Sequence, residues 1–173
     1  MIQEEIVEGD LLYHAVHGIC RVDEVNKQKE SGKQVLRYSL VPNTANRMKA
    51  RFIITASDMK ISGFHELVSV KEANKILDYL KVGPSATDSS SNRKNQIWDM
   101  ARAILTFAHE KFEAQDQRKR QTLERSARGL IGELAYVFKI SLKEAAEKVQ
   151  KSLGKPSKVN PSVLVALLHA GED

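Results

Sequence analysis

The sequence predicts an α+β protein of two domains, a small β-barrel followed by a bundle of helices. Three observations lead to this fold class. Short runs rich in β-branched and aromatic residues fill the first sixty positions, apolar residues recur at helical spacing after position 92, and a small, polar stretch separates the two parts. A chain of 173 residues is long enough for one mid-sized or two small domains with a real core.

The barrel is predicted from the strands of the first part. No helix-length segment lies between them, which excludes parallel βαβ units. Four or five strands at such short spacing close most easily into a small, strongly bent barrel. Turns are expected over 26–33 and 42–47, where Gly, Pro, Asn and Ser gather. The strand segments are DLLYH (10–14), GICRVDEV (18–25), QVLRYSLV (34–41) and MKARFII (48–54).

A helix is predicted directly after the barrel. Ser69 stands at its N-cap position, and Glu72, three residues on, completes a capping box. Apolar residues at helical spacing follow until Gly83 and Pro84 end the helix. The next stretch, GPSATDSSSN, is small and polar and is typical of a solvated linker. The expected organisation is a barrel over 1–67, the helix over 68–82, packing after the barrel, the linker over 83–92 and a helical domain over 93–173.

Every segment after the linker shows helical periodicity. Ser141 and Glu144 form another capping box, and Asn160 with Pro161 is typical of an N-cap and first helical position. Amphipathic helices of this number and length pack into a small bundle. We expect helices over 93–113, over 117–138, from Ser141 to Gly154, and from Asn160 to Leu168.

The net charge of +5 is unevenly distributed. Residues 1–90 hold 12 basic and 12 acidic side chains, whereas residues 91–173 hold 15 and 10. A basic half beside a neutral half suggests a polyanionic partner for the second part. The acidic N-terminus has no apolar h-region, and no apolar run approaches the roughly 20 residues that span a bilayer. We therefore expect a cytoplasmic protein without membrane contact.

His14, His17 and Cys20 recur every three residues and raise the question of a metal site. Structural zinc needs four ligands, and catalytic zinc needs three plus an open position. The trio straddles a predicted turn and the other histidines are scattered, so we expect no metal and no cofactor. In the simpler interpretation, Gly18 permits the backbone at a strand entry, and Cys20 alternates with Val22 toward the core.

Nothing in the sequence argues for an enzyme, since no nucleophile elbow and no phosphate-binding loop is present. Two basic clusters, one at the linker and one at the next helix, instead suit contacts with DNA phosphates; the alternative is a solvated helix face. Trp98 either stacks on a base or wedges into a groove, or packs in the core, as its helical spacing favours. The candidate DNA-binding residues are Arg93, Lys94, Trp98, Arg118, Lys119 and Arg120.

The segment EGDLLYHAVHGICRV resembles the opening of the CarD family (also called CdnL), a domain shared with the bacterial transcription-repair coupling factor. Members typically show Gly-Asp, a few apolar residues, and then His-Gly, with the Gly eight residues after the Asp. Gly9, Asp10, His17 and Gly18 fall on these positions. The resemblance continues through GKQVLRYSLV and KARFIITASDMKISGF, where Gly63 matches a family Gly, and ARGLIGELA resembles a late helix of the family.

The resemblance implies a five-stranded Tudor/SH3-like barrel that binds the β subunit of bacterial RNA polymerase. In the family an exposed Arg on the fourth strand makes this contact, and Arg51 stands there with Lys49 and Phe52 beside it. A guanidinium suits an interface because its planar fork pairs with carboxylates and is weakly hydrated. A second family Arg, in the turn after the second strand, falls near Gln28, with Lys27 beside it.

For the helical domain the resemblance implies contact with promoter DNA beside the transcription bubble. Members that stabilise open promoter complexes usually carry a wedge Trp just before a basic pair; here Ser91 occupies that position, ahead of Arg93 and Lys94. Trp98 follows about two helical turns later. The predicted protein is a transcription regulator that binds polymerase and promoter DNA and shifts promoters between closed and open complexes by binding one preferentially.

Three other functions remain open at this point. An adaptor would use the barrel for polymerase and the helices for another protein, and its DNA affinity would not depend on salt. A barrel that binds ribosomal RNA would bind structured RNA without polymerase. An enzyme would need a metal at the His14, His17 and Cys20 trio. For the predicted transcription regulator we expect a monomer.

Overall fold

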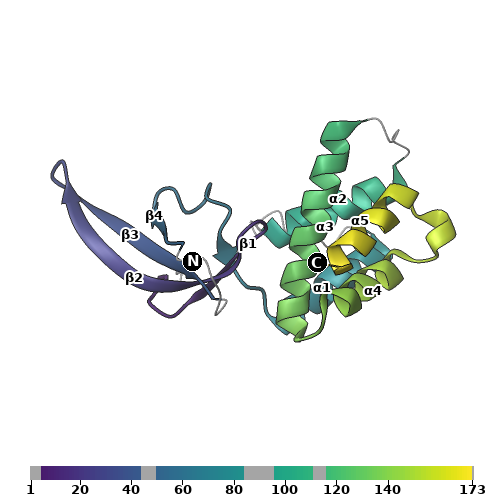
Figure 1. The fold of residues 1–173 in the computed structure, drawn as a ribbon, viewed down its shortest axis with the longest axis horizontal. Helices are drawn as coiled ribbons and strands as arrows, with labels where there is room; N and C mark the ends of the chain where they lie inside the picture. The colour runs from purple at the N-terminus through teal and green to yellow at the C-terminus, as the bar shows by residue number, and fades with distance from the viewer. Residues whose placement is uncertain (1–4, 44–49, 84–95, 111–115, 173) are drawn as a thin grey trace. The chain divides into compact units, whose positions relative to one another are not determined.

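The computed structural model describes residues 5–43, 50–83, 96–110 and 116–172 (Figure 1). The chain divides into two compact units, Met1–Leu67 and Val68–Asp173. In the described ranges the first unit holds a five-stranded antiparallel sheet and the second holds five α-helices. The predicted α+β class is therefore confirmed.

Neighbouring strands of the sheet are all antiparallel and follow the order β4-β3-β2-β1-β5. Hairpins place β1 to β4 side by side in chain order, whereas β5 returns to the other side of β1. Gly18 opens β2 with a positive φ of 70°, a conformation that costs glycine little, as predicted. The strands are β1 (Leu11–His14), β2 (Gly18–Glu30), β3 (Lys33–Pro42), β4 (Phe52–Thr55) and β5 (His65–Glu66).

The β2–β3 hairpin is longer than predicted. The turn expected over 26–33 is wrong, because β2 continues to Glu30 and β3 begins at Lys33. Only Ser31 and Gly32 form the turn, both with positive φ (51° and 81°), which is the geometry whose twist matches the flanking strands. The polar composition is misleading here because residues 26–30 of β2 are all exposed, and a strand exposed on both faces needs no apolar alternation.

The core of the first unit forces the sheet to curl. Cys20 and Val22 both point into it and are buried (0% and 1% exposed), as predicted from their alternation. Phe52 on β4 and Phe64 just before β5 have ring centroids 5.6 Å apart, although their strands lie at opposite ends of the strand order. The sheet is therefore barrel-like. Its buried core residues are Leu12, Cys20, Val22, Tyr38, Leu40 and Phe64.

The helices predicted over 68–82, over 117–138 and from Ser141 to Gly154 are found nearly residue for residue. The helix predicted over 93–113 is observed over Gln96–His109, while 93–95 and 111–113 lie outside the described residues, and the last helix continues four residues beyond Leu168. At α4 the capping box is complete, since the Ser141 side chain accepts from the Glu144 N–H and the Glu144 carboxylate accepts from the Ser141 N–H. At α1 the Ser69 half of the box forms, in which Ser69 Oγ accepts from the Glu72 N–H. The helices are α1 (Val70–Val82), α2 (Gln96–His109), α3 (Gln117–Phe138), α4 (Leu142–Leu153) and α5 (Pro161–Glu172), with a 3₁₀ turn at Pro156–Lys158.

Helix α3 is the central element of the second unit and contacts all four other helices (Figure 1). Helix α1 packs on α4, α2 and α3, so the helix predicted over 68–82 belongs to the helical unit. Of the linker expected over 83–92, only residue 83 lies within the described ranges. None of the helices in these ranges combines the length and the apolar character needed to cross a membrane.

Candidate partner-binding surfaces

Arg51 lies directly before β4, and its side chain is half exposed (49%). The guanidinium is held from one side: Nη1 donates to Ser39 Oγ at 2.8 Å, and Nη2 lies 3.0 Å from Asp23 Oδ2. An arginine has five N–H donors. Two contacts therefore fix the orientation of the fork and leave part of it accessible to a partner.

A β-bulge brings Asp23 to Arg51. The register between β2 and β3 shifts between Val22 and Glu24, so Asp23 is an extra residue on β2. A bulge of this kind turns a side chain away from its regular direction. The same carboxylate lies 3.7 Å from Arg21 Nη2 and thus stands between two guanidiniums. Sequence reasoning missed this arrangement because no local pattern signals the bulge.

Apolar surface and a strand edge adjoin the guanidinium. Ile53, two residues after Arg51 and paired with Ser39, is 66% exposed. Strand β4 ends the strand order, so among the described strands only one of its edges is paired. Such an edge offers backbone N–H and C=O groups to a further strand. We call this set the Arg51 surface; it consists of Arg21, Asp23, Ser39, Arg51 and Ile53.

Phe52 does not belong to the Arg51 surface. Its ring centroid lies 4.5 Å from that of His17 and 5.6 Å from that of Phe64, on the inner side of the sheet. Alternation along the strand explains this, because successive side chains point to opposite faces. The prediction that Phe52 lies beside Arg51 in one contact surface is corrected accordingly. Lys49, the other predicted neighbour, lies outside the described residues.

Lys27 and Gln28 lie on the hairpin arm and not in a turn. Both are exposed on β2, where they pair with Leu36 and Val35 of β3. Lys27 is four residues along the strand from Asp23, which corresponds to about 13 Å. The structure therefore does not bring these two residues together with the Arg51 surface.

The imidazole of His14 holds the β1–β2 turn together. Its Nδ1 accepts from the backbone N–H groups of Val16 (3.0 Å) and His17 (3.2 Å), so this nitrogen carries no proton. The proton of the neutral ring is then on Nε2, which donates to the Ser62 carbonyl at 3.2 Å. Burial lowers the pKa of His14, and the neighbouring His17 and His65 lower it further. A neutral His14 is thus built into the fold.

The His14, His17 and Cys20 trio does not converge on a metal site. Both nitrogens of His14 are engaged in the turn, and the Cys20 thiol is buried in the core. Burial raises the pKa of this thiol, which keeps it in the unreactive protonated form. In the part of the chain that the structure describes, no three His, Cys, Asp or Glu side chains are placed to share a metal ion.

Trp98 is a packing residue of the helical unit. It is 5% exposed, its Nε1–H donates to Glu72 Oε1 at 3.0 Å, and its ring meets Tyr79 edge-on. A ring in this position cannot stack on a base or enter a groove without leaving the core. The prediction that Trp98 contacts DNA is therefore corrected in favour of the core alternative.

The basic cluster at the start of α3 is not a single surface. Lys119 lies 2.8 Å from Glu110 Oε1, and this hydrogen bond with the adjacent carboxylates raises the pKa of Lys119. Arg118 and Arg120 are both exposed, but residues two apart on a helix point about 160° away from each other. Arg93 and Lys94, the other predicted DNA contacts, lie outside the described residues.

Arg118 instead shares one side of α3 with residues that sequence reasoning missed. Steps of seven residues from Arg118 lead to Arg125, Gly132 and Lys139. Arg125 and Lys139 are exposed, as Arg118 is. Seven residues are nearly two helical turns, so Arg118, Arg125 and Gly132 form one line along α3. Lys139 follows as the C-cap residue of the helix, with a left-handed φ of 55°. A search for this spacing in the helical segment would have found it. We call Arg118, Arg125, Gly132 and Lys139 the α3 line.

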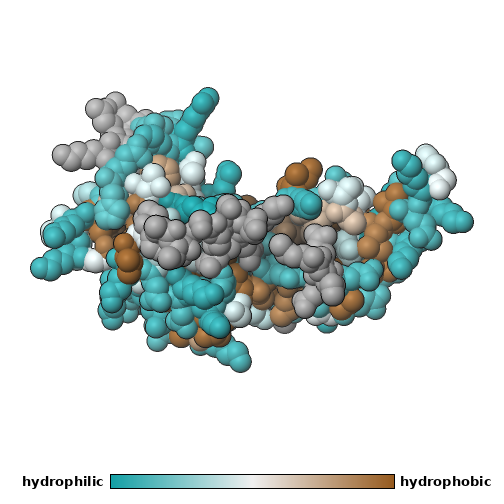
Figure 2. Space-filling model, turned by 180° about the vertical axis from the view of Figure 1, so that it is seen from behind, coloured by the Kyte–Doolittle hydropathy of each residue, from teal (hydrophilic) through white to brown (hydrophobic). Residues whose placement is uncertain are grey.

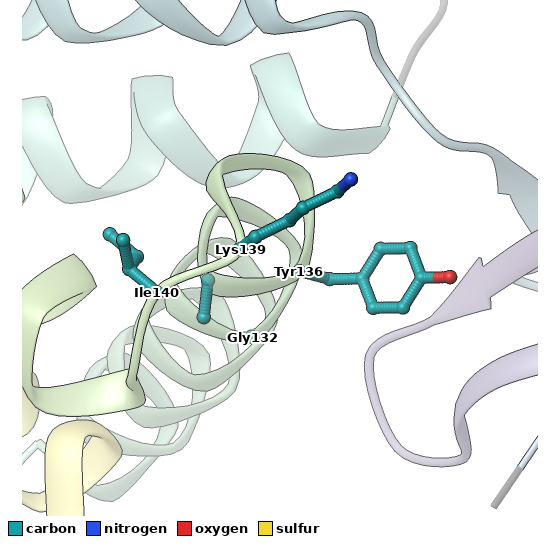
Figure 3. A pocket seen from close by; sticks show the side chains of 5 residues that line it. Gly132, Tyr136, Lys139 and Ile140 are labelled. Atoms are coloured by element: carbon teal, nitrogen blue, oxygen red, sulfur yellow. The ribbon is translucent and has the colours of Figure 1, made fainter.

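A hollow of 510 Å³ opens at the C-terminal end of the α3 line. Gly132 leaves room there, and Tyr136, which is 41% exposed, stands beside it. Figure 3 shows the side chains of Tyr136 and Lys139 extending to the same side of the helix, away from Ile140. The remaining lining residue is Ala135.

Charged and polar surface predominates on the face shown in Figure 2, where hydrophobic residues form small, separate areas.

The chain has been compared with known proteins. No model of a protein family matches it, and no curated protein matches it. Assignment of a partner therefore depends on the residues described above.

Proposed function

We propose that the protein is a CarD-like transcription regulator. It binds the β subunit of RNA polymerase through residues 1–67, folded as a Tudor-like barrel, and promoter DNA through its helical unit. The observation that carries this proposal is the exposed, fixed fork of Arg51, which stands where the sequence resemblance places the polymerase contact.

The Arg51 surface suits a protein partner for three reasons. A guanidinium already held by Asp23 and Ser39 loses little further freedom when it pairs with a partner's carboxylate. The exposed side chain of Ile53 provides apolar area beside it. The outer edge of β4 can accept a partner strand, which adds backbone hydrogen bonds.

The helical unit supports a role on DNA through charge. The net positive charge of the chain comes entirely from residues 91–173. The α3 line presents exposed cations, and phosphate contacts of this kind supply affinity without reading sequence. Because Trp98 is buried, this contact is electrostatic and involves no wedge from that residue. Preferential binding to one promoter state would then shift the balance between closed and open complexes.

The proposal is tested by the affinity of the full-length protein for the isolated β subunit. Arg51→Glu places a carboxylate next to Asp23 and should weaken binding by more than about thirtyfold, since truncating a paired interfacial charge costs about 2–5 kcal/mol. Lys33→Glu, at the tip of the hairpin arm of the same unit, is the matched control and should change the affinity by less than about threefold. Equal effects of the two variants, or none, would refute the assignment of Arg51.

An adaptor on polymerase that does not bind DNA is the second candidate. It is favoured by the burial of Trp98 and by the pairing of Lys119 with Glu110, which together remove two of the predicted DNA contacts. The slope of log affinity against log salt distinguishes the two functions. Counterion release gives a clearly negative slope for a DNA-binding regulator, and a slope near zero would identify the adaptor.

A further inference from the structure

The α3 line places two cations, Arg118 and Arg125, along one exposed side of α3 and a third, Lys139, at the C-cap of this helix. Arg118 and Arg125 are about 10 Å apart along the axis, and Lys139 lies about 32 Å from Arg118. Among the residues that the structure describes, no carboxylate pairs with Arg118, Arg125 or Lys139. Glu124 is exposed beside Arg125 but points about 100° away from it. This side of the helix is therefore a linear array of positive charge.

An aromatic ring interrupts the array at its C-terminal end. Tyr136 projects next to the hollow at Gly132, with Lys139 one turn further along. The hollow, at 510 Å³, is within the range that accommodates small organic groups. Cations that follow the phosphate backbone, combined with an aromatic ring on which a base can stack, are features by which proteins bind single-stranded nucleic acid.

We propose that the α3 line and Tyr136 bind one unpaired nucleic-acid strand. Arg118, Arg125 and Lys139 take phosphates, and a base enters the hollow and stacks on the Tyr136 ring. A duplex does not fit this arrangement as well, because its bases already stack on each other and would have to be extruded to reach a ring on the helix side. The inference rests on the proposed function, in which the helical unit meets DNA, and adds the class of strand that it takes.

The experiment measures fluorescence anisotropy of the full-length protein with labelled oligo(dT) and, in parallel, with a labelled hairpin duplex. Tyr136→Ala should weaken oligo(dT) binding by about five- to a hundredfold, as expected for the loss of one base stack. Tyr136→Phe keeps the ring and should stay within about twofold of the wild type. Neither variant should change duplex affinity by more than about twofold.

A second pair of variants tests the line of charge. Arg125→Gln should reduce the salt slope for oligo(dT) by about 0.7, the value for one phosphate contact on a single strand. Arg120→Gln removes the same charge from a different side of α3 and should leave the slope unchanged. The substituted positions are all exposed, and circular dichroism melting checks that each variant is folded.

Each outcome separates this inference from the proposed function. Equal oligo(dT) affinity for Tyr136→Ala and wild type, or equal slopes for the two arginine variants, overturns the single-strand surface. Binding of the duplex alone overturns it as well but leaves the regulator proposal standing. Loss of oligo(dT) binding only in Tyr136→Ala and Arg125→Gln supports the surface, and it does so whether or not Arg51 binds polymerase.

Discussion

The two units present arginine in two different ways. In the sheet unit Arg51 is clamped by Asp23 and Ser39, and the clamp depends on a bulge that moves Asp23 out of register. In the helical unit Arg125 extends from a regular helix, and among the described residues it has no ion-pair partner. A clamped fork favours a partner whose carboxylate matches its direction, whereas an unclamped cation responds to charge alone.

This difference is the reason for proposing a protein partner for the sheet unit and nucleic acid for the helical unit. Specific protein interfaces gain affinity from groups that are already ordered before binding. Phosphate contacts gain it mainly from counterion release, which requires charge at suitable spacing and little fixed geometry.

The largest expected effect concerns the packing of the sheet unit that carries the Arg51 surface. A Cβ at Gly63 would lie 2.7 Å from His14 Nε2, and the backbone there has a φ of 87°. Gly63→Ala should therefore lower the free energy of unfolding by about 3 kcal/mol, from steric overlap and backbone strain together. Denaturant unfolding followed by circular dichroism measures this change.

Gly32→Ala is the matched control for Gly63→Ala. Gly32 has a similar φ of 81°, but no atom lies within 4 Å of the place that an added methyl group would take. Only backbone strain remains, so the expected loss is about 1 kcal/mol. Similar losses at the two glycines would show that contact with His14 plays no part in the stability of this unit.

A smaller effect is expected from the protonation of His14. Its folded-state pKa is lowered from the ordinary value of 6.5, so the folded state binds fewer protons than the unfolded state between the two pKa values. The contribution of neutral His14 to the free energy of unfolding is fully present above pH 6.5, and it is lost as pH falls through the folded-state pKa of His14. The physical reason is that protonated Nδ1 can no longer accept from the Val16 and His17 N–H groups.

Unfolding experiments at several pH values measure this dependence. His14→Gln should flatten the change in stability below about pH 6.5, the ordinary value for histidine, although it also lowers stability at neutral pH. His17 and His65 remain in the variant, so any difference between the two pH profiles comes from position 14. An unchanged pH profile in His14→Gln would contradict the assigned role of the imidazole.

How much of the structure is visible in the sequence differs between the units. The helices are predictable because Ser69, Ser141 and Asn160 carry local capping signals and the apolar spacing is regular. The resemblance locates Arg51 as the residue proposed to contact polymerase, but it does not reveal the clamp. Asp23 reaches Arg51 across strand β3, and such a contact depends on register and a bulge that a linear pattern does not specify.

The errors at the candidate sites have the same origin. Adjacency in sequence groups Phe52 with Arg51, yet adjacent residues on a strand face opposite sides. Closeness in sequence likewise groups Arg118 with Arg120, although they diverge on the helix. Grouping by periodicity instead of adjacency separates both pairs and joins Arg118 to Arg125.

The smallest effect on stability is expected from a substitution at Trp98, which tests whether this residue belongs to the core. Trp98→Phe keeps an aromatic ring but removes the N–H that donates to Glu72, so stability should fall by about 1 kcal/mol. DNA affinity should stay within about twofold of the wild type, because the ring is 5% exposed. If Trp98→Phe left stability unchanged and strongly reduced DNA affinity, Trp98 would be a DNA-contacting residue and not a core residue.

The most direct test of the difference between the two units replaces one arginine guanidinium in each unit with a lysine ammonium group. Arg51→Lys and Arg125→Lys keep the charge, and the affinities of both variants for the isolated β subunit and for labelled oligo(dT) are measured side by side. We predict that Arg51→Lys loses at least about tenfold in affinity for the β subunit, whereas Arg125→Lys keeps its affinity for oligo(dT) within about twofold. Full β-subunit affinity in Arg51→Lys, or a tenfold loss of oligo(dT) affinity in Arg125→Lys, would contradict the distinction between a clamped and an unclamped arginine.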